Sequence, residues 1–245
     1  MQILESHLLK RFPEVVFGLS TKNGVNNNSP FHFNLSLTVG DDPDAVWKNR
    51  EVFFNELGLT SSQIAIQRQI HSDIVTLVEK PGLIGESDAM ITDKFNVGLA
   101  VSTADCVPIF LYDHAQKVVA GIHSGWRGTQ QQILRKTLVA LKENFGSEGK
   151  DIYVYIGPSI CQKNYEVGKE VAEQFDKKYL TMLNGKLCLN VIHANYDMVC
   201  NFGIPEDQIE ASQFCSYEEK ELLHSYRRDG KNSGRSLGVI AMKEK

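Results

Sequence analysis

The residues best suited to chemistry are two histidines, His71 and His123, and one cysteine, Cys106. Cys106 lies directly before the apolar run Val107–Leu111, and His123 directly follows the apolar run Val118–Ile122. Two imidazoles and one thiolate suit Zn²⁺, and three protein ligands leave a fourth position for water or substrate, as catalytic zinc requires. The residue types therefore predict a metal site made of His71, Cys106 and His123.

The same side chains also fit two other interpretations. Cys106, activated by a histidine and steadied by Asp105, would resemble the nucleophile of a cysteine hydrolase. In a purely structural interpretation, each histidine is a hydrogen-bonded polar residue and Cys106 is a small buried hydrophobe beside Val107. The spacing is not a compact zinc-finger pattern, so it does not decide among these interpretations.

Arginines in turn-like, glycine-containing contexts form a further signal. Arg127, Arg227, Arg228 and Arg235 have such contexts, in which guanidinium groups can clasp phosphate or carboxylate. A helix expected just beyond Arg127 would add its N-terminal amides to an anion-binding corner. On a strand, Arg227 and Arg228 would face opposite ways, so one of the pair would reach the site. Arg127 and Arg228 are the phosphate candidates, and a solvated surface cluster is the alternative for Arg227-Arg228.

Strands must support these side chains. The apolar runs around Cys106 and His123 are joined by the polar turn Tyr112–Lys117, which predicts two neighbouring buried strands. Alternating polarity predicts half-buried strands at Phe31–Val39 and Ile64–His71. In the first of these, Asn34 and Ser36 point to the same polar face and are candidate substrate contacts. Further strands are expected at Val15–Leu19, from Gly98 onward, at Ile152–Ile156 and at Leu237–Met242.

Helix signals lie between these strands. Asp42-Pro43 begins a helix that runs to Gly58, and an amphipathic helix covers Ile133–Phe145. Shorter helices are expected at Val167–Phe175 and His193–Phe202. Since strands and helices do not alternate strictly, a simple doubly wound sheet is disfavoured, and antiparallel pairs are expected. We predict one mixed α/β domain, α+β-like, over residues 1–245.

Composition narrows the class of protein. The chain has 245 residues, 42% of them hydrophobic, and a net charge of −4, which is enough for a large core. Without a long basic block, nucleic acid is not an expected partner, and no run approaches the ~20 apolar residues of a membrane helix. The N-terminus lacks the features of a secretory signal, and the five scattered cysteines are typical of reduced thiols, so we expect a cytoplasmic protein.

Ordered motifs along nearly the whole chain resemble the YfiH-like proteins, also called the laccase-domain or polyphenol-oxidase family. The motifs are Asn34-Leu35-Ser36-Leu37, Gly40-Asp41-Asp42-Pro43, Gln69-Ile70-His71-Ser72-Asp73, Ser87-Asp88-Ala89-Met90-Ile91-Thr92, Ala104-Asp105-Cys106-Val107-Pro108, His123-Ser124-Gly125-Trp126-Arg127-Gly128, Ile156-Gly157-Pro158, Tyr165-Glu166-Val167-Gly168 and Tyr226-Arg227-Arg228-Asp229. Lys22, where the family often has arginine, and Ser124, where alanine is usual, depart from the pattern.

The resemblance implies layered mixed sheets flanked by helices and a zinc ion bound by His71, Cys106 and His123. It also implies a purine nucleoside phosphorylase that cleaves adenosine, inosine or methylthioadenosine with inorganic phosphate, and adenosine deamination in some members. The expected products are a free base and ribose 1-phosphate, or methylthioribose 1-phosphate. The alternatives are a copper-dependent polyphenol oxidase, a cysteine hydrolase or editing factor acting on peptidoglycan precursors, and a metal-binding module without catalysis. Asn34, Ser36, Asp105, Arg127 and Arg228 are the predicted substrate and phosphate contacts.

Overall fold

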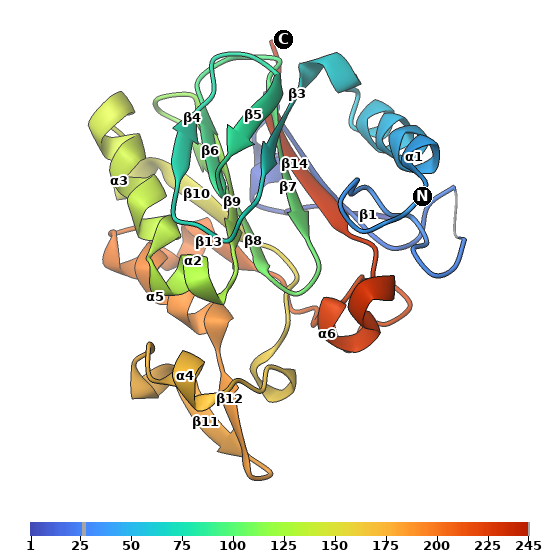
Figure 1. Ribbon diagram of the computed structural model, residues 1–245. Coiled ribbons are helices and arrows are strands. Elements are labelled where there is room, and N and C mark those ends of the chain that lie inside the picture. The colour runs from blue at the N-terminus through green and yellow to red at the C-terminus, as the bar shows by residue number, and fades with distance from the viewer. Residues whose placement is uncertain (26–27, 245) are drawn as a thin grey trace.

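Two mixed sheets are stacked face to face in the computed structural model, which describes residues 1–25 and 28–244 (Figure 1). Within those residues, each sheet has six strands. Sheet A has the order β1 (Ile3–Leu4), β2 (Val15–Ser20), β14 (Ser236–Met242), β7 (Gly98–Thr103), β3 (Ile64–Arg68) and β5 (Gly82–Glu86). Sheet B has the order β13 (Ile209–Ala211), β10 (Ile152–Ile156), β8 (Val107–Asp113), β9 (Val118–Ser124), β6 (Ala89–Thr92) and β4 (Val75–Leu77). Both sheets contain parallel and antiparallel pairs.

The space between the sheets is filled by large apolar side chains. Leu99 and Val101 of β7 pack with Phe110 of β8 and Val119 of β9 in one buried cluster. Contact is close enough that a Cβ atom on Gly238 of β14 would lie 2.3 Å from Phe110 Cζ. The lack of a side chain at Gly238 therefore makes room for the Phe110 ring between the sheets.

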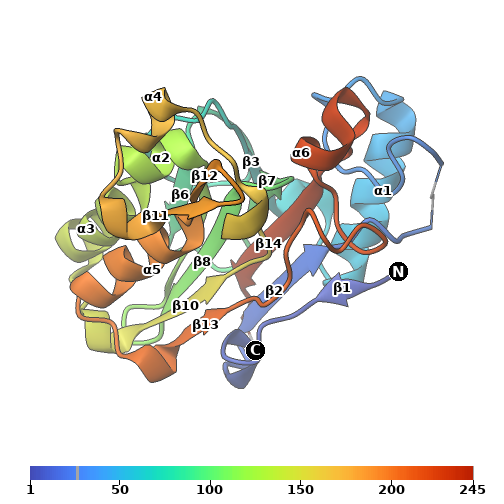
Figure 2. The same ribbon diagram turned by 90° about the horizontal axis from the view of Figure 1, so that it is seen from below.

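Helices cover the outer faces, which gives a four-layer arrangement of helix, sheet, sheet and helix (Figures 1 and 2). Helices α3 (Ile133–Phe145) and α5 (Val191–Asn201) pack on sheet B, and α1 (Pro43–Glu56) packs on sheet A. The shorter elements are α2 (Trp126–Gln130), α4 (Lys169–Ala172), α6 (Tyr226–Asp229) and the hairpin of β11 (Leu180–Leu183) and β12 (Lys186–Leu189). None of the helices in residues 1–25 and 28–244 has the length and apolar character needed to span a bilayer.

Several connections pass from sheet A to sheet B. Residues 69–74 join β3 to β4, residues 87–88 join β5 to β6, and residues 104–106 join β7 to β8. Each of these connections carries residues that come together at the site described below. The stacking of the two sheets thus determines how the site is assembled.

The mixed α/β fold and its layered sheets are confirmed. The strands expected at Val107–Leu111 and Val118–Ile122 are antiparallel neighbours over their whole length. The amphipathic helix ends as predicted, with Gly146 in the left-handed region at φ 74°, where glycine avoids the Cβ penalty. Asp42 is the N-cap of α1, and its side chain accepts a hydrogen bond from the Asp44 backbone amide.

The strand expected at Phe31–Val39 is wrong, because this segment forms turns and loop. Phe33 and Leu35 are buried as the alternation predicts, but their backbone is not paired in a ladder. The Asn34 side chain accepts from the Ser36 amide, and Arg50 Nε donates to the Leu35 carbonyl. Side chains and single backbone contacts, such as the Leu35 amide to the Arg235 carbonyl, therefore satisfy the backbone groups that a neighbouring strand would otherwise bind.

Two helical predictions also need correction. The helix expected over Val167–Phe175 is shorter and covers only Lys169–Ala172. Arg227 and Arg228 lie in a helical turn, Tyr226–Asp229, and not on a strand, so they do not point in opposite directions by strand geometry. Arg127 lies inside the short helix α2. The helix therefore begins before Arg127 and not beyond it, and the predicted anion-binding amides are displaced with the helix start.

Candidate metal centre

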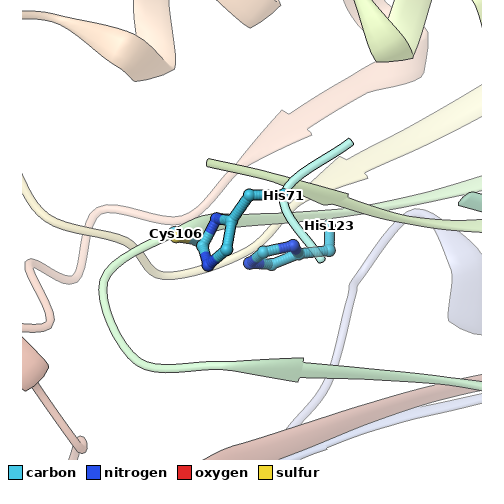
Figure 3. Close-up of side chains that lie close together, drawn as sticks. All are labelled: His71, Cys106 and His123. Carbon is cyan, nitrogen blue, oxygen red and sulfur yellow. The ribbon is translucent and has the colours of Figure 1, made fainter. Parts of the chain in front are cut away.

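His71, Cys106 and His123 converge at one end of the two sheets. One ligand atom from each, two ring nitrogens and a sulfur, all lie within 4.8 Å of one another. Figure 3 shows the two imidazoles and the thiol turned toward one another, and the ring centroids of His71 and His123 are 4.9 Å apart. The donor set fits zinc, which favours imidazole nitrogen and thiolate sulfur. The clustering predicted from residue types is therefore present.

The backbone around the cluster is specialised. His71 has φ 58° and Asp105, next to Cys106, has φ 90°, in the left-handed region that residues other than glycine rarely adopt. Gly125 lies directly beside the ligands: a Cβ there would be 2.9 Å from His71 Nδ1 and 3.0 Å from Cys106 Sγ. Glycine at position 125 therefore leaves the space between these two ligands open.

Asp88 organises the ligands from behind. It is fully buried, and its Oδ1 contacts His123 Nδ1 at 2.8 Å. The same carboxylate accepts hydrogen bonds from the backbone amides of Ile70, His71 and Ser72 and from the Ser72 hydroxyl. A carboxylate on Nδ1 fixes the tautomer that leaves Nε2 free to bind a metal. Asp88 thus orients His123 directly and His71 through its backbone.

The charges of these groups depend on each other. Burial would raise the pKa of the Cys106 thiol, but the neighbouring His123 charge and hydrogen bonds from His123 and His71 lower it to about 6. Burial would lower the pKa of His123, but Cys106 and Asp88 raise it to about 9. For Asp88, burial opposes ionisation, yet hydrogen bonds from His123 and Ser72 lower the pKa to about 2. Without metal, the cluster therefore favours a thiolate beside an imidazolium.

Asp105 lies next to the cluster but is engaged with the protein. Its Oδ1 accepts from the Ser216 hydroxyl at 2.6 Å, and its Oδ2 accepts from the Arg227 amide at 2.6 Å. These bonds connect the loop that carries Cys106 to the segment around α6. Its position supports a role in positioning Cys106 and Arg227.

Arg127 and Tyr165 provide polar groups near the cluster. Arg127 is exposed, and its guanidinium carbon lies 4.4 Å from the Trp126 ring centroid. In the described part of the chain, that guanidinium has no hydrogen-bond acceptor. Burial and the charges of Cys106 and Asp105 raise the pKa of Tyr165, while Arg227 and Arg127 oppose the rise. Tyr165 is therefore a neutral phenol close to Cys106 and to two arginines.

Arg228, the second phosphate candidate, has a different environment. It donates to the carbonyls of Ser216, Tyr217 and Leu223 and to both carboxylate oxygens of Asp229. These contacts occupy every N–H of a guanidinium group. Its contacts therefore do not support the predicted role in holding phosphate.

The structure does not bring Asn34 and Ser36 into the ligand cluster. Asn34 is fully buried and binds the Ser36 carbonyl, the Asp41 carboxylate and the Arg235 amide. The Ser36 hydroxyl pairs with Thr38 at 2.9 Å. Both residues stabilise the loop, and through the Arg235 backbone Asn34 reaches a segment near the site.

Sequence reasoning gave no role to Asp88 and Tyr165, and it placed Arg235 among the arginines that could bind an anion without making it a phosphate candidate. The charges of Cys106 and Asp105 raise the pKa of Arg235, although burial outweighs them and lowers it. This guanidinium therefore lies in the field of the ligand cluster. Asp88 and Tyr165 stand in the Ser87–Thr92 and Tyr165–Gly168 motifs, which was the available signal for them.

The chain is similar to known proteins over most of its length. The family described as multi-copper polyphenol oxidoreductase laccase matches residues 16–243. Among solved structures, YlmD from Geobacillus stearothermophilus has a TM-score of 0.91 and 28% identity over 98% of this chain and 94% of that chain. The YfiH protein of Bacillus licheniformis has a TM-score of 0.89 and 30% identity over 94% of this chain and 93% of that chain. The chain therefore belongs to the laccase-like family of YfiH- and YlmD-related proteins.

Curated relatives carry more specific names. A protein of Clostridium acetobutylicum, 35% identical over 91% of this chain and 90% of its own length, is named a purine nucleoside phosphorylase. A Bacteroides thetaiotaomicron protein with the same name is 32% identical, again over 91% and 90%. A protein from an unknown prokaryotic organism, named adenosine deaminase RL5, is 33% identical over 94% of this chain and 95% of its own.

Proposed function

We propose that this protein is a zinc-dependent purine nucleoside phosphorylase that cleaves adenosine, inosine or methylthioadenosine with inorganic phosphate. The observation that carries the proposal is the cluster of His71, Cys106 and His123, with His123 held by Asp88. The names of the curated relatives support the same substrate class. All five cysteines are free thiols, which fits the reducing cytoplasm that we propose as its location.

Each side chain has a defined task in this proposal. His71, Cys106 and His123 would hold zinc, which when bound supplies a Lewis acid for a substrate oxygen. The exposed guanidinium of Arg127 binds phosphate, because it has no competing acceptor in the described part of the chain. The neutral phenol of Tyr165 donates a hydrogen bond to the substrate, and Asp105 positions the Arg227 segment.

A copper-dependent polyphenol oxidase is the first competing function. Four-electron reduction of oxygen by multi-copper enzymes uses several copper sites rich in histidine. In residues 1–25 and 28–244, His71 and His123 are the histidines in the potential metal-binding clusters, and they share one cluster. The ligands therefore favour a single-metal site over a set of copper centres, although the family description refers to copper.

The remaining alternatives use the same side chains differently. A thiol hydrolase acting on peptidoglycan precursors would use the Cys106 thiolate as nucleophile, and that thiolate is favoured next to His123. Adenosine deamination, named for one relative, would need water and no phosphate. We include deamination as a second activity of the same centre.

The decisive experiment measures metal and nucleoside turnover together. We expect this centre to hold about one zinc per chain, as three ligands and an open position predict, and His71→Ala, Cys106→Ala and His123→Ala each to lose about one zinc per chain relative to the parent. Omitting phosphate should abolish release of hypoxanthine from inosine but spare ammonia release from adenosine, and excluding oxygen should change neither. Intact nucleosides with zinc and phosphate supplied, together with copper-dependent oxygen uptake on a phenol, would establish the oxidase instead.

The phosphate site is tested with arginine variants. Arg127→Ala should raise the KM for phosphate by about tenfold, which corresponds to the ~1.4 kcal/mol of one charge-assisted contact. Arg135→Ala is a matched control, because Arg135 is exposed on α3 and, within residues 1–25 and 28–244, its guanidinium bonds only to Gln132. Arg227→Ala should have a smaller effect on phosphate, since its guanidinium binds the carbonyls of Asn164 and Glu166. An equal effect of all three substitutions would remove Arg127 from this role.

A further inference from the structure

A second group of potential metal ligands lies outside the first centre. Cys161 follows β10, and Cys215 follows β13, which is the parallel neighbour of β10. A bridge between Ser159 and Cys215 extends this pairing into the two loops. The sulfur atoms of Cys161 and Cys215 and a carboxylate oxygen of Glu218 all lie within 4.8 Å of one another.

A single amide group contacts all of these atoms. Asn164 Nδ2 lies 3.2 Å from Cys161 Sγ, 3.6 Å from Cys215 Sγ and 2.9 Å from Glu218 Oε1. An amide nitrogen carries only two hydrogens, so it cannot satisfy three acceptors fully. Turning the amide about its last side-chain bond would put its carbonyl oxygen at the same position, as a fourth ligand.

The distances match a tetrahedral site for a zinc-sized ion. With Zn–S of about 2.3 Å and Zn–O of about 2.0 Å, neighbouring sulfur and oxygen ligands are about 3.5 Å apart and two oxygens about 3.3 Å apart. The three distances from the Asn164 amide, 3.2, 3.6 and 2.9 Å, are within about 0.4 Å of those values. The amide position thus forms one corner of a coordination tetrahedron.

We propose that Cys161, Cys215, Glu218 and Asn164 form a second binding site, for a thiophilic divalent cation such as zinc. Two thiolates and a carboxylate are a ligand set that zinc accepts, and soft sulfur ligands select against magnesium and calcium. Cys215 is buried, whereas Glu218 is 42% exposed, so the site is anchored inside and open to solvent on one side.

The surroundings compensate charge and orient the sulfurs. Lys163 Nζ lies 2.7 Å from Glu218 Oε1, and its charge offsets the excess negative charge of two thiolates and a carboxylate around a divalent ion. The Cys161 amide donates to Cys215 Sγ at 3.2 Å, an outer contact of the kind that fixes a ligand.

The second site connects the loops that hold the first one in place. The hydroxyl of Ser216, next to Cys215, donates to the Asp105 carboxylate, and the backbone carbonyl of Asn164 accepts from the Arg227 guanidinium. A cation bound here would therefore stabilise the segments on which Asp105 and Arg227 depend. The site itself uses none of the ligands of the first centre, so the inference does not rest on the proposed function.

Cobalt titration of the reduced full-length chain tests the proposal. Cys106→Ala removes the only thiol of the first centre, so any thiolate-to-cobalt charge-transfer band must come from elsewhere. We expect such a band to saturate at about one Co²⁺ per chain, as one four-ligand site requires. Zinc should displace the cobalt and raise the thermal midpoint of this variant by a few degrees.

Second substitutions in the Cys106→Ala chain identify the ligands. Cys161→Ser and Cys215→Ser should abolish the band, and Glu218→Gln, at an exposed position that does not endanger folding, should weaken cobalt binding about tenfold. Cys200→Ser, which alters a partly buried thiol outside the cluster, should leave the band unchanged. The proposal is overturned if the folded Cys106→Ala protein gives no band, if Glu218→Gln binds cobalt as tightly as its parent, or if thiol counting shows Cys161 and Cys215 joined as a disulfide.

Discussion

Asp88→Asn is the sharpest test of how the metal centre is held. The substitution keeps the shape of a buried side chain but replaces one acceptor oxygen with an NH₂ group. Asp88 Oδ1 serves His123 Nδ1 and the His71 amide, and Oδ2 serves the Ile70 amide and both donors of Ser72. Asparagine can satisfy only one of these two sides, because its nitrogen would face N–H or O–H donors on the other.

The size of the effect on metal affinity follows from the orientation in which the asparagine oxygen keeps the Ser72 contacts. The asparagine nitrogen then donates to His123 Nδ1, which leaves the proton on Nε2 and prevents that nitrogen from binding metal. Loss of such a carboxylate partner lowers metal affinity by about 10–100-fold, or about 1.4–2.7 kcal/mol. The unpaired His71 amide and the lost charged acceptor should also lower the free energy of unfolding by about 2–4 kcal/mol.

Zinc affinity is measured by competition with a chromophoric chelator, and folding by circular dichroism and urea unfolding. Asp73→Asn is the matched control: it makes the same change in the same loop, at a side chain that is 33% exposed and paired with Lys136. The control should keep its zinc affinity and lose at most about 1 kcal/mol of stability. A folded Asp88→Asn protein that binds zinc within about twofold of the parent would refute the role of the carboxylate in fixing the tautomer.

Three further predictions concern other residues. Gly125→Ala should reduce metal content without unfolding the protein, because its φ of −74° and ψ of 176° accept alanine while the added Cβ would crowd His71 and Cys106; elemental analysis of the folded variant checks this. Burial lowers the pKa of His224 from 6.5 to about 3 in the folded protein. As the pH drops below about 6.5, the unfolded chain therefore binds a proton at this histidine that the folded chain does not bind, and the free energy of unfolding falls. Between pH 7 and pH 5 the loss from this residue should be about 2 kcal/mol in urea unfolding, and His224→Gln, but not the exposed control His7→Gln, should remove that part of the pH dependence. Arg228→Ala should lower the free energy of unfolding by about 2–4 kcal/mol, because it leaves three carbonyls and Asp229 without their donor; a loss under about 0.5 kcal/mol would contradict that structural role.

The sequence predicts the central strands well, because every residue of β8 and β9 is buried and continuous apolar runs report such burial directly. It also predicts that Cys106 and His123 come close together, because Cys106 directly precedes β8 and His123 lies near the end of the neighbouring β9. The alternation in Phe31–Val39 misleads in two ways: the polar Asn34 and Ser36 are buried while Leu37 is 42% exposed, and the backbone is not paired in a ladder. The partners of its backbone, Arg50 and Arg235, lie elsewhere in the chain, so no local pattern reveals them.

The supporting residues were harder to predict for a related reason. Asp88 acts on a histidine 35 positions away, and only the stacking of the sheets brings them together. The local sequence around Arg228 resembles that around a phosphate-binding arginine. In the structure, however, its guanidinium N–H groups donate to the carbonyls of Ser216, Tyr217 and Leu223. A structural guanidinium group differs from a ligand-binding one in its hydrogen-bond partners. Those partners lie outside the local sequence motif, so the motif does not reveal them.

The passage of the chain between the sheets has a consequence for folding kinetics. His71 and Cys106 stand on connections from sheet A to sheet B, while His123 ends a strand of sheet B. Neither sheet alone can present the complete set, so rapid metal capture would begin only after the sheets have docked, and its time course would report that docking step. Phe110, on the strand that follows Cys106, meets sheet A at Gly238 of β14. A smaller side chain at position 110 would slow docking and delay metal uptake while leaving every ligand in place.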